Sequence, residues 1–449
     1  MPINDGRKGD PPERMGKPVM IAGPSRRAGW FAVYGVWLAL SATSAWSGSQ
    51  LPVEFGQKDV HTHHVKSVVG PSVHIDEKGF IAAAWVEEDK DVRTIFFAKS
   101  DTPGGPLGQP VRVNDPSESP YYRQESPALS LHGNDVFLTW SKTHPNMTPD
   151  KPFSSELRLS RSHDGGRTFA PSTLVNDDGQ VINHTFDAMQ VAPDGAVHMA
   201  WIDGREGKKE PGTFVARSAD GGRTVTKNMK VDENTCVCCR TALAASSDGT
   251  IYLAWRKILD GNVREIVVSR SIDGGENFSR PTIVGNDRWV YPACPHRPAS
   301  LGVDRQGRLY VAWYTEGADE TPAIYLAYSD DKGSTFSEKH QLNRSKGTFP
   351  DHPQMAVDQE GRVVVVWEEQ SPVRREVVVS YSVDRGGSFS IPMKLNEKNG
   401  QTPTVAVNQQ GTVVMGWKEH AMPAHRMVLQ TMSFPSVQVA GEGSGRHGH

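Results

Sequence analysis

The chain has 449 residues, about three average domains, and its 49 basic and 52 acidic side chains give a formal net charge of −3. This balance excludes a basic nucleic-acid-binding protein as the first interpretation, so no nucleic-acid partner is expected. Hydrophobic residues at 37% and charged residues at 22% exclude both a disordered chain and a multi-span membrane protein. The many glycines, prolines and tryptophans (43, 31 and 11) predict an all-β protein whose short strands are joined by turns.

Residues 1–50 have the pattern of an N-terminal extension with an export signal. Arg26 and Arg27 precede the apolar stretch AGWFAVYGVWLALSATSAWS, which ends in small residues as secretory leaders do. The arginine pair also permits a twin-arginine signal, and the length of the stretch permits a retained anchor. We expect an exported chain, periplasmic or extracellular, with no membrane span after the leader. Residues 441–449 are expected to be a flexible tail.

A tryptophan recurs in one local context every 50 to 61 residues, at Trp85, Trp140, Trp201, Trp255, Trp313, Trp367 and Trp417. An alternating strand pattern and a turn precede each tryptophan, and two further short strand patterns follow most of them. Four short strands repeated at about 50 residues are typical of propeller blades. We therefore expect residues 51–440 to form one β-propeller, with seven blades favoured over six. Residues 61–69 are expected to supply the strand that closes the ring.

A second repeat, S-x-D-x-G, lies between the third and fourth strand patterns and begins at Ser162, Ser218, Ser271, Ser329 and Ser382. Its aspartate can accept hydrogen bonds from nearby backbone N–H groups, and its glycines allow positive φ, so it predicts a hairpin loop. Over residues 70–400 the chain resembles the Asp-box (BNR-repeat) β-propellers of the sialidase superfamily. The resemblance implies that these loops are structural and lie away from the active face.

The starts of the innermost strands are the expected functional positions, because in a propeller they converge on one mouth of the central channel. Blade alignment places Arg123, Arg240 and Arg297 there, with Asp351 and His352 at the equivalent position of the sixth blade. The resemblance to sialidases implies a three-arginine clamp for a substrate carboxylate, because each guanidinium can contact a carboxylate bidentately. The expected ligand is therefore a carbohydrate or another acidic small molecule.

The same resemblance implies a tyrosine nucleophile backed by a carboxylate, and an aspartate as acid/base. The candidates are Tyr291, Glu233 and Asp187, with no cofactor required. The chain departs from the family in its first blade, where the F/Y-R-I-P motif is replaced by VVGPSV at residues 68–73. Whether the protein is an exo-α-sialidase-type glycoside hydrolase or a glycan-binding protein is therefore left open.

All four cysteines fall on two adjacent rim loops. Cys236, Cys238 and Cys239 precede the inner strand of the fourth blade, and Cys294 and His296 precede that of the fifth. Thiolates with an imidazole suit Cu(I) or Zn(II), which would make this a non-hydrolytic, metal-binding propeller. Disulfides are the favoured alternative, because an exported chain with an even number of cysteines commonly forms them. A third possibility is an interaction scaffold with a purely structural rim.

Overall fold

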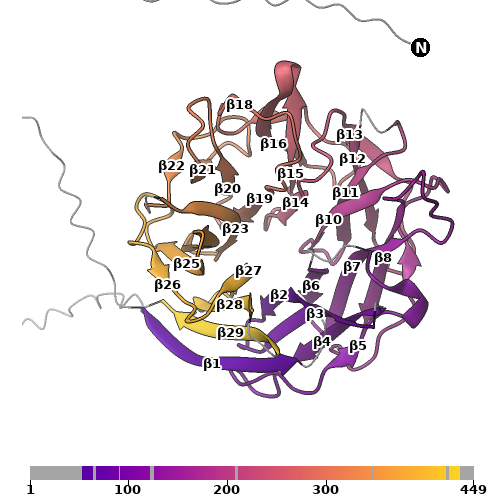
Figure 1. Ribbon diagram of the computed structural model, residues 1–449, viewed down its shortest axis with the longest axis horizontal. Helices are drawn as coiled ribbons and strands as arrows, with labels where there is room; N and C mark the ends of the chain where they lie inside the picture. The colour runs from indigo at the N-terminus through magenta and orange to yellow at the C-terminus, as the bar shows by residue number, and fades with distance from the viewer. Residues whose placement is uncertain are drawn as a thin grey trace, which may run out of the picture. The chain divides into compact units, whose positions relative to one another are not determined.

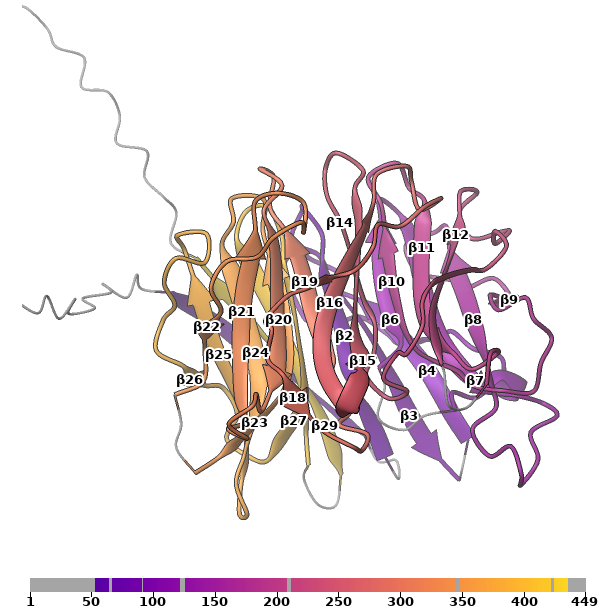
Figure 2. The same cartoon turned by 90° about the horizontal axis from the view of Figure 1, so that it is seen from above.

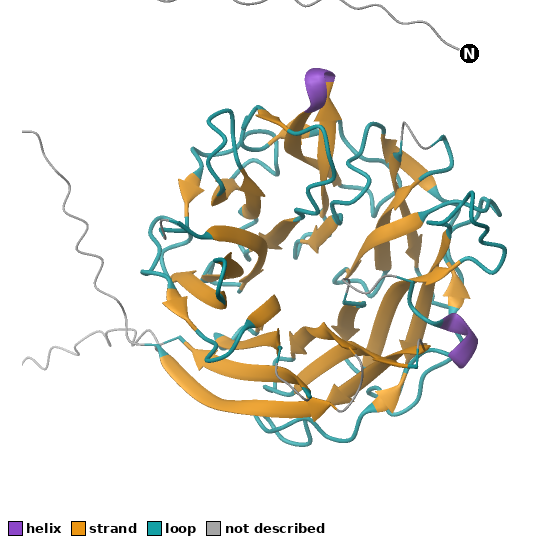
Figure 3. Cartoon of the chain, in the orientation of Figure 1, coloured by secondary structure: helices purple, strands orange, loops and turns teal. Residues whose placement is uncertain are grey.

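The computed structural model describes residues 53–63, 67–90, 92–121, 126–207, 211–344, 347–420 and 424–434. Seven antiparallel sheets follow one another around a ring, which confirms the all-β fold and the seven-bladed alternative (Figure 1). Helix is limited to two short 3-10 turns in the described residues, η1 (Pro116–Glu118) and η2 (Asp260–Asn262), as Figure 3 shows. None of the described helices is long and apolar enough to span a membrane.

Each blade has four strands, ordered from the channel outward. Blade one is β2 (Ser67–Ile75), β3 (Ile81–Asp89), β4 (Val92–Lys99) and β5 (Val111–Arg112). Blade two is β6 (Ala128–His132), β7 (Asp135–Thr143), β8 (Ser155–Ser162) and β9 (Thr173–Leu174). Blade three is β10 (His184–Val191), β11 (Val197–Asp203), β12 (Gly212–Ser218) and β13 (Met229–Asp232).

Blade four is β14 (Ala242–Ala245), β15 (Ile251–Leu259), β16 (Val263–Ser271) and β17 (Thr282–Ile283), with β18 (Trp289–Val290) added to β16. Blade five is β19 (Ala299–Val303), β20 (Leu309–Thr315), β21 (Ala323–Ser329) and β22 (His340–Gln341). Blade six is β23 (Phe349–Val357), β24 (Val363–Gln370), β25 (Arg375–Ser382) and β26 (Met393–Lys394). Blade seven is β27 (Gly400–Val407), β28 (Thr412–Glu419), β29 (His425–Ser433) and β1 (Glu54–His63).

The ring is closed by β1, which pairs antiparallel with β29 and forms the outer strand of blade seven (Figure 1). The closing strand therefore begins at Glu54, seven residues before the expected start at residue 61. Residues 67–75, which overlap the expected closing segment, instead form the inner strand of blade one. Pairing the two ends of the chain in one blade joins its first and last strands by a ladder of backbone hydrogen bonds.

The repeated tryptophans lie in the second strand of each blade, where neighbouring blades cover both faces. All seven are buried, with Trp140 the most exposed at 3%. A tryptophan side chain buries roughly 200 Å² of surface, which at about 25 cal/mol per Å² stabilises the fold by about 5 kcal/mol. These second strands are the core of the propeller, and they hold the inner strands in place around the channel.

The S-x-D-x-G loops are the hairpins between the third and fourth strands. In blade four, Oδ1 of Asp273 accepts hydrogen bonds from the N–H groups of Glu276 and Asn277, and Oγ of Ser271 accepts one from Gly275. Gly275 has a φ of 87°, a conformation that glycine adopts without strain. Because strands alternate in direction, these hairpins lie on the face opposite to the loops that enter the inner strands (Figure 2).

Four inner strands, β2, β10, β23 and β27, carry a register shift near their first residues. Three of the shifts contain a non-glycine residue with positive φ, namely Phe186 (58°), His352 (47°) and Thr402 (50°). His296, just before β19, shares this conformation at 53°. Bulges and strained residues of this kind re-aim side chains and are concentrated at functional sites. Here they surround the channel mouth.

Candidate functional site

A cavity of about 130 Å³ lies at the channel mouth and draws its wall from all seven blades. We call it the mouth cavity. Its lining includes Pro71, Ser126, Phe186, Cys238, Arg240, His296, His352 and Thr402. A larger cavity of about 470 Å³, the side groove, shares Phe186, Cys238 and His296 with it. The two cavities together are large enough for a small-molecule ligand.

The side groove is mainly apolar. Tyr121, Phe153, Phe186, Ile182 and Val237 line it, and 65% of Phe153 is exposed. Aromatic and aliphatic walls of this kind provide contact surface, while the few polar groups determine a ligand's orientation. Where the groove joins the mouth cavity, Cys238 and His296 contribute polar groups to both.

Arg240 links the inner strands of three blades. Its Nε donates a hydrogen bond to the backbone oxygen of Asp187, and Nη1 donates to that of Ser126 at 2.9 Å. Nη2 lies 3.9 Å from Oδ2 of Asp187. The side chain is still 24% exposed, so one edge of the guanidinium faces the mouth cavity while the other holds the rim together.

Arg297 is held by Asp351 and Tyr314. Its Nε lies 2.9 Å from Oδ1 of Asp351, and its guanidinium stacks 5.0 Å from the centre of the Tyr314 ring. Nη1 donates to the backbone oxygen of Pro295 at 2.9 Å. The Arg297 side chain is 26% exposed, and among the described residues only its third nitrogen, Nη2, has no partner, so it presents one nitrogen rather than an open fork. Arg123, the third arginine of the expected clamp, lies outside the described residues.

His352 is flanked by two buried carboxylates. Its Nδ1 lies 3.0 Å from Oδ1 of Asp351 and 3.8 Å from Oε1 of Glu368, which are 3% and 2% exposed as residues. Burial opposes protonation of the imidazole, but the two carboxylates outweigh it and raise the pKa of His352. Burial also raises the pKa of Glu368, whose Oε1 accepts the Thr402 N–H at 2.7 Å.

The orientation of the His352 ring follows from its exposure. Nδ1 is fully buried, although 39% of the side chain is exposed. The exposed part is therefore the opposite edge of the imidazole, which carries Nε2. His352 lines the mouth cavity, so the Nε2 edge faces it while Asp351 and Glu368 support Nδ1 from behind. Carboxylate support of this kind sets the tautomer and orientation of a functional histidine.

Sequence reasoning put Asp351 and His352 on the rim but missed Glu368 as a functional candidate. A signal was present, since Glu368 directly follows the tryptophan of its blade in a strand that begins Val-Val-Val-Val-Trp. Arg256 and Lys418 occupy the same position in blades four and seven. A charged residue in the centre of a buried strand requires a partner or a function.

The three expected catalytic residues have different surroundings. Asp187 is 2% exposed and accepts a hydrogen bond from Oγ1 of Thr139 at 2.5 Å. The Glu233 side chain is 63% exposed and lies 3.9 Å from Lys230. Tyr291 packs on Trp289, with ring centres 5.0 Å apart. Neither Glu233 nor Tyr291 lines the mouth cavity or the side groove.

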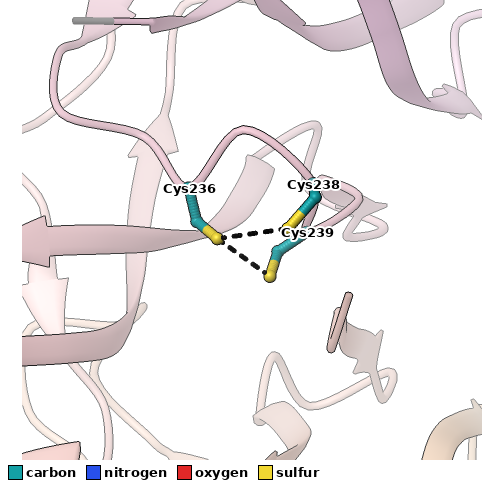
Figure 4. A group of neighbouring side chains, drawn as sticks. All are labelled: Cys236, Cys238 and Cys239. Carbon is teal, nitrogen blue, oxygen red and sulfur yellow. Dashed lines mark hydrogen bonds between the residues drawn. The ribbon is translucent and has the colours of Figure 1, made fainter. Parts of the chain in front are cut away.

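The cysteines of blade four lie together as thiols. Sγ of Cys236 is 3.2 Å from Sγ of Cys239 and 3.8 Å from Sγ of Cys238 (Figure 4). Their S–H groups hold the pKa of Cys236 well below its usual range. Cys294 is exposed in the side groove, and the structure has all four cysteines free, without the favoured disulfides. His296 borders both cavities, with its ring 5.9 Å from that of Phe186.

A second group of metal-ligand type, His184 with Asp178 and Asp203, is an internal ion-pair network. His184 Nε2 lies 3.1 Å from Asp178 and 3.7 Å from Asp203. Asp203 is already occupied by Arg205, which contacts both of its oxygens, and by the Trp201 indole N–H. Because these donors satisfy its lone pairs, the group stabilises blade three and is not a free ligand set.

Comparisons with known proteins give matches in fold only. No protein-family model and no curated protein matches the sequence. A protein of unknown function from Dyadobacter fermentans is 15% identical, with a TM-score of 0.50 over 85% of this chain and 99% of that chain. An ulvan lyase, a polysaccharide lyase, is 10% identical, with a TM-score of 0.54 over 82% of this chain and 95% of that chain. A sialidase from Streptococcus pneumoniae is 11% identical, with a TM-score of 0.46 over 85% of this chain and 70% of that chain.

Proposed function

We propose that this protein binds the acidic end of a carbohydrate at the channel mouth, with the carboxylate in the mouth cavity and the remaining sugar in the side groove. One observation carries the proposal. Cationic and donor groups face the cavity, while the carboxylates that hold them lie buried behind. Arg240, His296 and His352 line the cavity, whereas Asp187 and Asp351 are at most 3% exposed.

The electrostatic consequence is selectivity for anions. Each buried carboxylate fixes the position of a cation, so little further ordering is needed when a ligand binds. The remaining N–H donors then contact a carboxylate through charge-assisted hydrogen bonds. The ulvan lyase with the same fold was solved with -[GlcA(1-4)Rha3S]-, a chain that contains an acidic sugar. That likeness concerns the fold, and the support for this chain comes from its own cavity.

A catalytic role in this proposal falls to His352. Its Nε2 edge faces the ligand cavity, and Asp351 and Glu368 stabilise the imidazolium that forms when it accepts a proton. Asp187 is instead a positioning residue for Arg240, because its backbone oxygen and carboxylate both face that guanidinium. The protein would act outside the cytoplasm, as its N-terminal sequence predicts.

Calorimetric titration tests the proposal. The ligands are glucuronate- and sialate-terminated oligosaccharides, each compared with the amide in which the carboxylate is neutral. We expect the acids to bind and the amides to bind at least about tenfold more weakly, since charged hydrogen bonds are stronger than neutral ones. Equal affinity for acid and amide, or no binding of either, would rule out an acidic-sugar site. Release of a fluorogenic leaving group from the same sugars then separates a hydrolase from a binding protein.

A further inference from the structure

We infer that Cys236, Cys238 and Cys239 form a binding site for one Cu(I) ion, and that the buried guanidinium of Arg256 supplies the counter-charge for the anionic thiolate complex. This inference is independent of the proposed carbohydrate site. Of its four side chains, only Cys238 also lines the mouth cavity and the side groove, and the copper site is tested with metal alone.

The three sulfurs already have nearly the spacing that a metal ion requires. Metal–thiolate bonds of about 2.3 Å place sulfurs around one ion about 3.8 to 4.0 Å apart. The two measured Sγ–Sγ distances are 3.8 and 3.2 Å, and all three sulfurs lie within 4.8 Å of one another (Figure 4). A shift of about 0.6 Å that lengthens the Cys236–Cys239 distance from 3.2 Å would give this pair the required spacing.

The number of donors favours Cu(I) over Zn(II). No fourth cysteine, histidine or carboxylate in the described part of the chain joins the three thiols at this spacing. Structural zinc sites are tetrahedral with four protein ligands, whereas soft thiolate sets are well suited to Cu(I). Cys236, Cys238 and Cys239 are 0%, 5% and 0% exposed, which also disfavours a water as the fourth ligand.

Arg256 is a buried cation without a carboxylate partner among the described residues. It is 1% exposed, and its Nε and Nη2 donate only to the backbone oxygens of Arg297, at 3.1 Å, and Tyr314, at 2.7 Å. Nη1 is buried without a hydrogen-bond partner. Glu265, a buried carboxylate on the adjacent strand, accepts the N–H groups of Asp287 and Arg288 instead. The guanidinium also lies over the Trp289 ring, 5.0 Å from its centre, but an indole has no net negative charge. A buried cation without an anion is costly, so its location calls for an anion nearby.

Once Cu(I) binds, the three deprotonated thiols provide this negative charge. The Cys236 N–H donates to the backbone oxygen of Arg256 at 2.8 Å, so the two residues are direct neighbours across the sheet edge. The Arg297 N–H, next to the carbonyl that Arg256 binds, lies 3.4 Å from Sγ of Cys239. Binding of Cu(I) by three thiols releases three protons to solvent and transfers no electron. The resulting complex has two negative charges, one of which Arg256 offsets.

Metal titration of the full-length reduced protein under anaerobic conditions tests the site. Cu(I) is added in competition with bicinchoninate, and Zn(II) with a chromophoric chelator. We expect one Cu(I) per chain, a sulfur-to-metal absorption band in the near ultraviolet, and weaker binding of Zn(II). Cys236→Ser and Cys239→Ser should each lower Cu(I) affinity by at least about a hundredfold, because two thiolates remain. Cys294→Ser is the matched control and should change the Cu(I) affinity by less than about twofold.

The counter-charge is tested by Arg256→Met and Arg256→Lys. Methionine should weaken Cu(I) binding about tenfold and Zn(II) binding less, because the copper complex has the larger negative charge. Arg256→Lys keeps the positive charge. It should therefore retain the ratio of the Cu(I) affinity to the Zn(II) affinity, even if both affinities fall. Arg264→Met is the control, since Arg264 is also buried and donates only to backbone oxygens, those of Tyr291 and Ala293.

Two results would overturn the inference in distinguishable ways. Absence of Cu(I) binding would rule out the metal site, and a reductant-sensitive mass loss of two hydrogens that Cys236→Ser abolishes would identify a disulfide of Cys236 in its place. Equal losses of Cu(I) and Zn(II) affinity in Arg256→Met would show that Arg256 acts through the fold alone. Neither result bears on the acidic-sugar site, because that site is tested with sugars in metal-free protein.

Discussion

At the scale of single residues, Arg240 both holds the rim and lines the mouth cavity, whereas Arg297 holds the rim through Asp351 and leaves 26% of its side chain exposed. Arg240→Lys and Arg297→Lys should each weaken a carboxylate ligand by about 1.5 kcal/mol, roughly tenfold. Lysine retains the charge, but its single nitrogen cannot both hold the rim oxygens and contact the ligand. Calorimetry with the acid and its amide measures the loss, which should be confined to the acid.

The matched control for these two variants is Arg374→Lys. Arg374 lies on the β24–β25 hairpin with 61% of its side chain exposed, and its change should leave both ligands unaffected. If acid and amide lose affinity equally in Arg240→Lys, the arginine acts only by holding the three inner strands together.

His352 gives a second prediction at this scale. His352→Gln keeps the size and polarity of the side chain but removes the titratable imidazole. It should leave the KM of an acidic substrate within about threefold and lower kcat by about a hundredfold or more, the usual contribution of an acid/base group. Glu368→Gln should lower kcat less, because Asp351 still supports the ring. A fall in binding with unchanged kcat would make His352 a ligand contact rather than a proton carrier.

At the scale of elements, the S-x-D-x-G hairpins join successive blades. A Cβ on Gly222 would come within 3.4 Å of Phe137, and a Cβ on Gly386 within 3.3 Å of Tyr310, so each hairpin packs on the blade before it. The Ser271 hydroxyl and the Asn277 side chain lower the pKa of Asp273, which is an acceptor throughout the physiological range. The loops therefore act as spacers between blades on the face away from the mouth.

Asp273→Ala should accordingly lower the melting temperature without changing ligand or metal affinity. The substitution removes the acceptor of two backbone N–H groups and leaves the mouth untouched. Differential scanning calorimetry and ligand titration on the same preparation measure the two effects. A variant with unchanged melting and lost binding would place the loop in the site instead.

His198, in strand β11, makes the stability of the folded protein depend on pH. Burial lowers the pKa of His198 from 6.5 to about 4, the nearby Arg217 acts in the same direction, and Asp194 opposes them. The folded protein thus binds fewer protons than the unfolded chain between these values. The stabilisation is fully present above pH 6.5 and is lost as the pH falls toward 4.

Urea unfolding as a function of pH measures this effect. The free energy of unfolding should rise by up to about 3 kcal/mol between pH 4 and 6.5 through His198, since each pKa unit is worth about 1.36 kcal/mol. His198→Gln should flatten this part of the curve. His74, whose pKa burial also lowers to about 4, acts with the same sign and remains in the variant. An unchanged slope in His198→Gln would assign the pH dependence elsewhere.

At the scale of the whole molecule, stability depends on ring closure. A chain that starts at residue 64 lacks β1, whose register with β29 runs from Glu54 to His63. We expect its melting temperature to fall by more than about 10 °C and its exposed β29 edge to promote self-association. A chain that starts at residue 53 is the control and should behave as the full chain does. Equal melting of the two would mean that closure contributes little.

Much of this architecture could be predicted from periodicity. The tryptophan spacing identified the seven blades, because each blade must bury one large side chain between its neighbours, and that requirement recurs once per repeat. The S-x-D-x-G pattern identified the outer hairpins for a similar local reason. The expected closing strand was displaced by several residues, since pairing between the two chain ends is a long-range contact with no local pattern.

The candidate site was only partly predictable. The position of the inner-strand starts followed from blade alignment, so Arg240, Arg297, His296 and the cysteines were found on the rim. Which partners these residues would contact could not be predicted, because Asp351, Glu368 and Arg256 come from other strands or neighbouring blades. The distances that couple Glu368 to His352, or leave Arg256 without a carboxylate, depend on side-chain packing between elements far apart in the sequence.

By itself, therefore, the sequence determined the repeat, the fold class and which loops face the channel, because these depend on local hydrophobic periodicity and turn chemistry. Only the tertiary structure decided which side chains meet. It brought Cys236, Cys238 and Cys239 within 4.8 Å of one another while leaving Cys294 in the side groove. It also left Glu233 and Tyr291 outside the lining of the cavity that His352 faces. Chemistry at the mouth requires contact geometry, and inter-blade packing sets that geometry only once the ring is closed.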